Sequence, residues 1–179
     1  FNSIKEKKYE NNIIDFIYCA RLEKSKGINI FLELSSYYPN SRFYIYGELN
    51  VKSKEQIDKK EINYFKNKNK NIFFMDFIND PLLRHNNDNS IFIIPSEYGE
   101  GLPRGIIEAL SLKIPVIASH KSCVGLFDKK NLFVVTENKT NSYIEKINQI
   151  ISLRRNNNIE QFLNNGRNLV FQKYSELKI

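Results

Sequence analysis

The chain has 179 residues and a formal net charge of +7, from 27 lysines and arginines against 20 aspartates and glutamates. This length corresponds to one domain, and a hydrophobic content of 41% excludes a wholly disordered chain. Cys19 and Cys123 are too few for a disulfide framework or a cysteine-rich zinc site. No apolar run reaches the ~20 residues of a membrane-spanning helix. We therefore expect a globular domain in a reducing compartment, the cytoplasm.

The positive charge is spread along the chain, and its densest stretch, residues 52–70, mixes acidic residues with lysines. Glu55 and Lys59 have the spacing that supports a helix, so this stretch predicts a solvated helix face over residues 53–67. Nucleic-acid binding stays an alternative for a chain of this charge. Neither an aromatic RNA-binding motif nor a recognition-helix pattern accompanies the charge.

Apolar runs of strand length alternate with segments of helical periodicity. Strands are expected at residues 13–20, 42–46, 71–77, 90–94, 115–118 and 132–135. Helices are expected at residues 27–38, 53–67, 81–86 and 103–112, and over apolar stripes at 144–151 and 159–174, with a capping box of Ser142 and Glu145 opening the first stripe. This order predicts an α/β fold, a Rossmann-like doubly wound parallel sheet of about six strands. It occupies residues 13–179, and residues 1–12 form a polar entering arm.

Ligands of such open sheets bind beyond the carboxyl ends of the strands. After the first expected strand, Arg21 and Lys26 lie five residues apart, and a helix follows them. A helix N-terminus with free backbone N–H groups and two full positive charges suits a phosphate or diphosphate. An ordinary exposed basic loop is the alternative.

The segment after the fourth expected strand, residues 95–110, is richer in candidate features. Gly99 and Gly101 permit a ligand to approach the backbone closely, and Pro103 suits the first turn of a helix. The backbone N–H groups of residues 101–105 are then free for an anion or for sugar oxygens. Glu100 precedes the helix.

Glu108 lies about two turns into this otherwise apolar helix. A carboxylate in such a place needs a hydrogen-bonding partner. Arg104, four residues earlier on the same face, is one candidate, and a vicinal diol of a ligand is the other. The spacing leaves both open.

Other chemistries have little support. The sequence has no phosphate-binding Walker loop, no G-x-G-x-x-G, no histidine pair at metal spacing and no Asp-x-Asp. We expect His85 and His120 in surface or loop positions and Cys19 as a small buried hydrophobe. Cys123, in a loop near Lys121, is expected to be unreactive, with a reactive thiol as the minor alternative.

Two stretches carry a family resemblance. PSEYGEGLPRGIIEALSLKIPVIAS, from Pro95, resembles the signature of the retaining glycosyltransferases of family 4, in which seven residues separate two glutamates; Glu100 and Glu108 have this separation. FIYCARLEKSKGINIFLELSSYYPNSRFYIYG, from Phe16, is similar to the family's other hallmark, with NIFFMDFIND as the strand and loop between them. Together they cover nearly all of residues 13–179. Lys113 departs from the pattern, because it stands where the family usually has a glycine in the left-handed conformation.

The resemblance implies the C-terminal, donor-binding half of a GT-B enzyme, with the acceptor-binding N-terminal half absent. It implies that Arg21 and Lys26 hold the nucleoside diphosphate and that Glu108 accepts the ribose hydroxyls. Glu100 would meet the transferred sugar, and the backbone near Phe77 and Ile78 would meet the base. The remaining donor contacts implied are Gly47, Gly101, Leu102, Pro103 and Arg104.

The expected function is therefore the donor-binding half of a nucleotide-sugar-dependent retaining glycosyltransferase. It would transfer a hexose or related sugar to a polysaccharide or glycolipid acceptor, without a metal or other cofactor. The isolated half is expected to be inactive, and peripheral contact with the cytoplasmic face of a membrane is open. The alternatives are a non-catalytic nucleotide-sugar-binding or scaffold domain that needs a separate partner half, and the basic nucleic-acid-binding domain.

Overall fold

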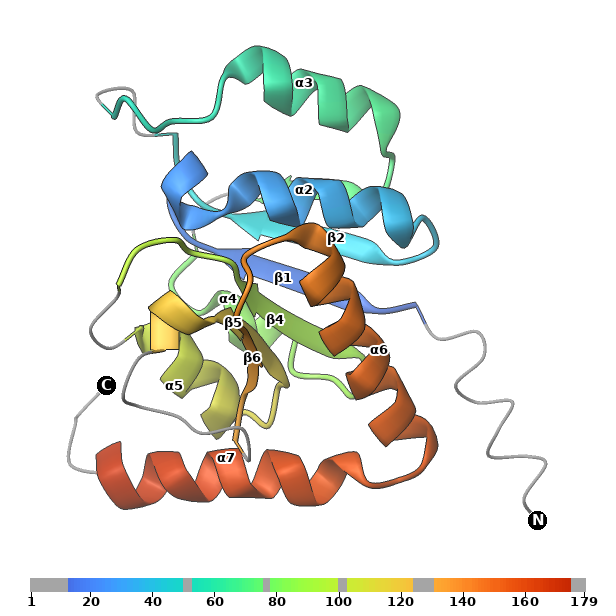
Figure 1. The fold of residues 1–179 in the computed structure, drawn as a ribbon, viewed down its shortest axis with the longest axis vertical. Coiled ribbons are helices and arrows are strands. Elements are labelled where there is room, and N and C mark those ends of the chain that lie inside the picture. Colours follow the sequence, from blue (N-terminus) through green and yellow to red (C-terminus); the bar gives the residue numbers. More distant parts are fainter. Residues whose placement is uncertain (1–12, 50–52, 76–77, 100–102, 124–130, 175–179) are drawn as a thin grey trace.

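The computed structural model describes residues 13–49, 53–75, 78–99, 103–123 and 131–174. They form a six-stranded sheet in the order β3-β2-β1-β4-β5-β6, in which all paired strands are parallel (Figure 1). This is the strand order of the Rossmann fold. The predicted α/β class and strand number are confirmed.

The secondary structure follows the predicted alternation. The strands are β1 (Asp15–Cys19), β2 (Arg42–Tyr46), β3 (Ile72–Met75), β4 (Ser90–Ile94), β5 (Val116–Ser119) and β6 (Phe133–Val135). The helices are η1 (Lys24–Lys26), α2 (Ile28–Tyr37), α3 (Lys59–Lys68), α4 (Pro81–Arg84), α5 (Arg104–Ser111), η2 (His120–Cys123), α6 (Thr140–Arg155) and α7 (Ile159–Tyr174).

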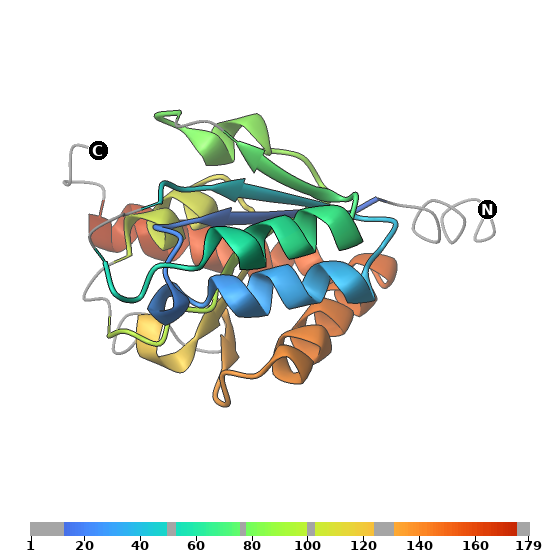
Figure 2. The ribbon, with the colours of Figure 1, turned by 90° about the horizontal axis from the view of Figure 1, so that it is seen from above.

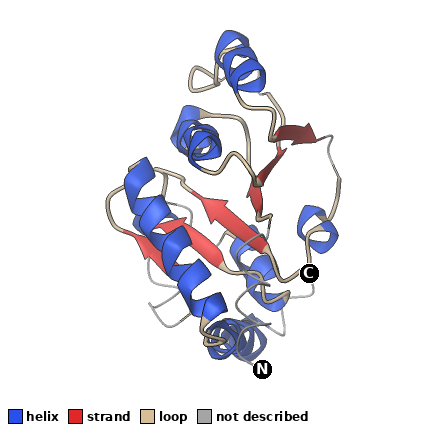
Figure 3. Cartoon of the chain, turned by 90° about the vertical axis from the view of Figure 1, so that its right-hand side faces the viewer, coloured by secondary structure: helices blue, strands red, loops and turns tan. Residues whose placement is uncertain are grey.

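Helices cover both faces of the sheet (Figures 2 and 3). One core lies under α2, α3 and α6, where Phe31, Phe43 and Tyr143 are fully buried. The other lies under α4, α5 and α7, around Phe92 and Ile106. After Asp15 and Ser90 at their starts, the central strands β1 and β4 are largely apolar because both of their faces are buried. No helix in the described ranges is long and apolar enough to cross a membrane.

The lysine-rich helix begins later than predicted. Its N-cap is Asp58, whose side chain accepts a hydrogen bond from the backbone N–H of Lys60 at 2.9 Å, so Glu55 and Lys59 do not share a helix. Residues 53–57 instead run beside the loop after β1: the Lys24 N–H donates to the Glu55 carbonyl at 2.7 Å, and the Ile57 N–H donates to the Leu22 carbonyl at 3.0 Å. Tertiary pairing therefore outweighs the local helical spacing.

Two further details concern helix ends. The capping-box prediction is wrong, because α6 begins at Thr140 after an N-cap at Lys139, and Ser142 already lies in its first turn. Lys113, after α5, has a φ of 58°, which confirms the left-handed conformation expected there. Its ammonium lies 2.6 Å from Glu160 Oε1 on α7, a contact that ties the two helices together.

Candidate functional site

The order of the sheet reverses direction between β1 and β4, so the loops that follow these two strands lie side by side at the carboxyl edge. They touch directly: the Glu97 N–H donates to the Ser25 carbonyl at 2.8 Å. Gly27, between η1 and α2, has a φ of 74°, and a Cβ there would overlap the carbonyl oxygen of Pro95. Only glycine combines this backbone angle with such a close approach.

The end of β2 is packed equally closely against the end of β1. The Ala20 N–H donates to the Tyr46 carbonyl at 3.1 Å, and a Cβ at Gly47 would overlap the Ala20 carbonyl oxygen. Gly47 therefore shapes the floor of the site through its lack of a side chain. The family resemblance implied Gly47 as a donor contact, and its close packing against Ala20 gives a structural reason for glycine at this position.

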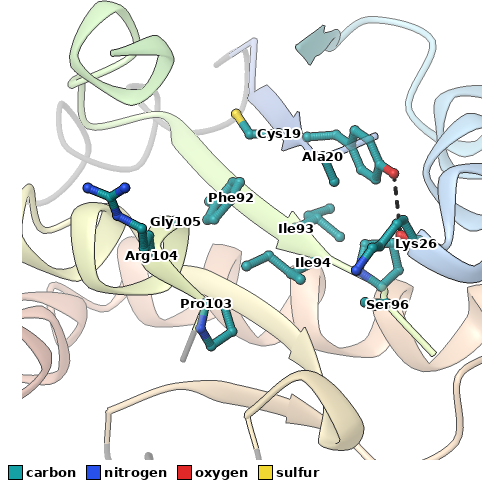
Figure 4. Close-up of a pocket in the computed structure, with 12 residues that line it drawn as sticks. Cys19, Ala20, Lys26, Phe92, Ile93, Ile94, Ser96, Pro103, Arg104 and Gly105 are labelled. Atoms are coloured by element: carbon teal, nitrogen blue, oxygen red, sulfur yellow. Dashed lines mark hydrogen bonds between the residues drawn. The ribbon is translucent and has the colours of Figure 1, made fainter. Parts of the chain in front are cut away.

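An open groove of about 580 Å³ lies at this carboxyl edge, between the ends of β1 and β2 and the start of α5. It brings together predicted residues from distant parts of the sequence: Arg21, Gly47, Ile78, Arg104 and Glu108. A smaller pocket between β1 and β4 adjoins it and is lined by Lys26, Pro103 and Arg104 (Figure 4). The two cavities share Cys19, Ala20, Arg104 and Gly105, so they form one continuous site.

Arg21 extends from the end of β1 with 58% of its side chain exposed. Its Nη1 atom lies 3.3 Å from Oε1 of Glu23, whose side chain is only 6% exposed. This buried carboxylate was not among the predicted site residues. Nothing local in the sequence marks it, since an acidic residue in a loop is normally exposed.

Lys26 lies at the opposite end of the same loop, at the last position of η1. Its ammonium is 5.6 Å from the centroid of the exposed Tyr98 ring in the loop after β4, within the range of a cation–π contact. The Lys26 carbonyl accepts a hydrogen bond from the Tyr18 hydroxyl at 3.4 Å. Both predicted cations thus lie at the site, one in each cavity.

Glu108 is half-buried on α5 and lines the groove. The ion pairs between described residues include none for Glu108 or Arg104, so the interpretation of Arg104 as the partner of Glu108 finds no support. Cys19 lies nearby, and burial, followed by the charge of Glu108, raises the pKa of its thiol. A carboxylate that lines a groove and has no ion-pair partner among the described residues suits a ligand that brings hydroxyl groups.

Four predicted contacts, Phe77, Glu100, Gly101 and Leu102, lie outside the described residues, so their roles stay predictions. Pro103 is placed at the N-cap of α5, one position before the first-turn place expected for it. Arg104 opens the helix and is exposed.

His85 lies in the turn that ends α4, which agrees with the predicted loop position, but it is not at the surface. It is buried, its Nε2 shares a 2.7 Å hydrogen bond with the Tyr46 hydroxyl, and its Nδ1 lies 3.9 Å from Oδ2 of buried Asp15. Burial alone would raise the pKa of Asp15, but hydrogen bonds from His85 and Arg42 lower it below its ordinary value. Because Tyr46 lines the groove, this chain of contacts braces one wall of the site from beneath.

Of the two cysteines, Cys19 differs from expectation and Cys123 agrees with it. Cys19 is partly exposed at the groove rather than fully buried. Cys123 is buried in η2, where burial raises the pKa of its thiol and its Sγ lies 3.2 Å from the Ser119 carbonyl oxygen. The minor alternative of a reactive Cys123 is therefore wrong. His120 is exposed, as predicted.

Comparison with known proteins bears on this geometry. The model of the family described as "Glycosyl transferases group 1" matches residues 2–169. An uncharacterized glycosyltransferase of Methanocaldococcus jannaschii is 35% identical over 127 residues, which are 66% of this chain and 29% of that protein. The chain therefore spans less than a third of the length of this relative.

Solved structures share the fold. HepE from Anabaena, in complex with UDP and glucose, has a TM-score of 0.76 at 19% identity, with 97% of this chain and 48% of that chain covered. The C-terminal domain of a glycosyl transferase group 1 family protein, LpcC, from Francisella tularensis has a TM-score of 0.70 at 24% identity, with 95% and 90% covered. Since the family model covers most of its length, this chain belongs to the group 1 glycosyltransferases and has the Rossmann-like fold of a C-terminal domain of such GT-B enzymes.

Proposed function

We propose that this domain is the donor-binding half of a retaining glycosyltransferase that uses a nucleoside-diphosphate sugar. The observation that carries the proposal is the continuous site at the carboxyl edge, where the cations of the loop after β1 lie opposite the carboxylate of Glu108 on α5, for which the described residues include no ion pair. A diphosphate needs the cations, and a ribose diol suits the carboxylate.

Arg21 and Lys26 hold the diphosphate, and Glu108 accepts the two ribose hydroxyls. Ile78, on the groove wall formed by residues 78–81, lies at the base end. The described geometry agrees with this order, because one groove joins Ile78 to Glu108 and Arg21, and the adjoining pocket continues to Lys26. The bound UDP and glucose in HepE support this class of ligand for the fold.

The chemical contribution of the site is electrostatic. When the glycosidic bond to the diphosphate breaks, negative charge accumulates on the leaving group. Positively charged donors placed in advance stabilise that charge better than water does, and such stabilisation is commonly the largest contribution in an enzyme site. Arg21 and Lys26 supply it without a metal ion. The described residues contain no cluster of three His, Cys, Asp or Glu side chains that could hold one.

Titration calorimetry of the chain with UDP, GDP and ADP tests the proposal, with EDTA added to a parallel sample. We expect binding of at least one nucleotide, unchanged by EDTA. Arg21→Ala should weaken diphosphate binding by roughly 10- to 100-fold, the value of a charge-assisted hydrogen bond, and leave nucleoside binding unchanged. Arg155→Ala, at the end of α6 far from the groove, is the matched control. Absence of binding for all three nucleotides would refute the proposal.

Glu108→Ala provides the complementary test. It should weaken binding of the ribonucleotide more than binding of the 2′-deoxyribonucleotide, because the deoxy ligand has only one of the two hydroxyls to lose. Equal losses for both ligands would contradict the assignment of Glu108 to the ribose.

The complete reaction is part of the proposal. In it, a hexose or related sugar passes, with retained configuration, to a polysaccharide or glycolipid acceptor bound by an N-terminal half. The 179-residue chain alone then binds donor but releases no UDP from a sugar nucleotide, and the whole enzyme does. A co-sedimentation assay with anionic vesicles tests the proposed contact with the cytoplasmic face of a membrane.

A further inference from the structure

The loop that carries Arg21 also carries a buried carboxylate that the proposed function does not use. We propose that Glu23 is a positioning residue: it holds the Arg21 guanidinium in the orientation that receives the diphosphate. This inference rests on the proposed function, in which Arg21 binds that diphosphate.

The first observation is the contrast in burial. The Glu23 side chain is 6% exposed and that of Arg21 is 58% exposed, and the two meet at 3.3 Å. A buried carboxylate is costly unless it is paired, and Arg21 supplies the one ion pair of Glu23 among the described residues. The buried member is therefore the anchor, and the exposed member is the group that it orients.

The second observation is that the backbone around Glu23 is held from several directions. The Glu23 N–H donates to the Arg21 carbonyl at 2.8 Å, and the Lys26 N–H donates to the Glu23 carbonyl at 3.0 Å. The same short segment forms an isolated antiparallel bridge between Glu23 and Gln56. Residues 53–57, which lie before α3, thus pair with the loop of Arg21 and hold the backbone of Glu23 in place.

A fixed carboxylate changes what Arg21 can do. A free arginine side chain loses rotamer entropy when a ligand immobilises it, and that loss weakens binding. A guanidinium has five N–H donors in a planar fork, so one edge can rest on Glu23 while the others remain for a phosphate. Pre-orientation of Arg21 lowers the cost of binding a diphosphate.

The same carboxylate also carries a negative charge, which by itself opposes an anionic ligand. Pre-orientation of Arg21 strengthens diphosphate binding, whereas the charge of Glu23 weakens it. Substitutions that change the length and the charge of residue 23 independently distinguish these two effects. Glu23→Gln keeps the length and an acceptor oxygen but removes the charge. Glu23→Asp keeps the charge but withdraws the oxygens by one methylene, and Glu23→Ala removes both.

The experiment is calorimetric titration of the chain and these variants with UDP and with uridine. We expect Glu23→Ala and Glu23→Asp to bind UDP about fivefold more weakly, or about 1 kcal/mol, while Glu23→Gln stays within about twofold of the parent. Uridine affinity should not change in any variant, because the proposed role of Arg21 is confined to the diphosphate, which uridine lacks. If Glu23→Ala fails to fold, as judged by thermal unfolding, the Glu23→Gln and Glu23→Asp variants still test the positioning role of Glu23.

Combination with Arg21→Ala completes the test. A residue that acts through Arg21 has no further effect on UDP affinity once Arg21 is removed, so the double variant should bind like Arg21→Ala alone. Glu160→Ala, which breaks the 2.6 Å pair with Lys113 away from the groove, should bind UDP like the parent.

The outcomes separate the two proposals. Unchanged or tighter UDP binding by Glu23→Ala and Glu23→Asp, with Arg21→Ala still impaired, overturns the role of Glu23 alone. Equal loss of UDP and uridine affinity overturns it too, since that marks a general structural effect. Unchanged UDP binding by Arg21→Ala overturns both this inference and the assignment of Arg21 to the diphosphate.

Discussion

Gly27→Ala is the substitution for which the structure gives the sharpest expectation. The residue has a φ of 74°, and an added Cβ would lie 2.6 Å from the carbonyl carbon and 2.8 Å from the Cβ of Pro95. The left-handed conformation costs a non-glycine residue about 1–2 kcal/mol. Overlap with packed backbone adds roughly 1–3 kcal/mol, because the loop after β4 cannot withdraw without breaking the 2.8 Å bond from Glu97 to Ser25. We expect a loss of about 3 kcal/mol.

Urea and thermal unfolding measure this loss, which for a chain of this length is a fall of about 6–12 °C in Tm. Gly99→Ala, in the loop that Gly27 contacts, is the matched control, because nothing lies within 4 Å of an added Cβ there. It should change stability by less than about 0.5 kcal/mol. UDP binding should weaken in Gly27→Ala, since the two loops would separate. Equal stability of the two variants would refute the close approach on which the site geometry depends.

Three other substitutions have defined outcomes. Lys113→Gly should raise the free energy of unfolding by about 0.5–1 kcal/mol, because glycine relieves the left-handed strain, whereas Lys113→Ala should lower it. The reverse order of the two variants in urea unfolding would contradict the strain. Tyr38→Phe should be at least as stable as the parent, because the buried Tyr38 hydroxyl has no hydrogen-bond partner among the described residues. Burial raises the pKa of Tyr38 to about 12. The contribution of the protonated hydroxyl to the free energy of unfolding is therefore present below pH ~10 and is lost as the pH rises through ~12. Tyr38→Phe should flatten this alkaline decline of stability, whereas Tyr37→Phe, which alters an exposed neighbour, should not. His85→Ala should cost about 2 kcal/mol in urea unfolding, and a cost below about 0.5 kcal/mol would contradict its role beneath the groove.

The strands are the part of the fold that local pattern predicts best. Two of them, β2 and β4, have the predicted bounds; β1 and β6 are shorter, β3 begins one residue later, and β5 is displaced by one residue. Strands buried on both faces are continuous apolar runs, and such runs are visible without knowledge of their neighbours. Residues at the ends of these runs face solvent or turns, so the apolar pattern does not predict where a strand begins or ends.

The helix over residues 53–67 shows where local pattern fails. Its lysine and glutamate spacing is helical throughout, yet residues 53–57 pair with the loop of Arg21, some 30 residues earlier in the chain. Backbone hydrogen bonds to that loop, together with complete burial of Ile57, outweigh a few exposed ion pairs worth a few tenths of a kcal/mol each. Helix propensity is weak enough to be overridden by such contacts.

The sequence by itself determined the alternation of strands and helices, the two loops that carry the candidate site, and the strained position of Lys113. These follow from periodicity and from motifs contained within about 30 residues. Only the tertiary structure decided that β1 and β4 are neighbours, that Arg21 and Glu108 share one groove, and that Glu23 and His85 are buried beneath it. Burial of a charged or polar side chain depends on what folds over it from elsewhere in the chain, and no local spacing encodes that.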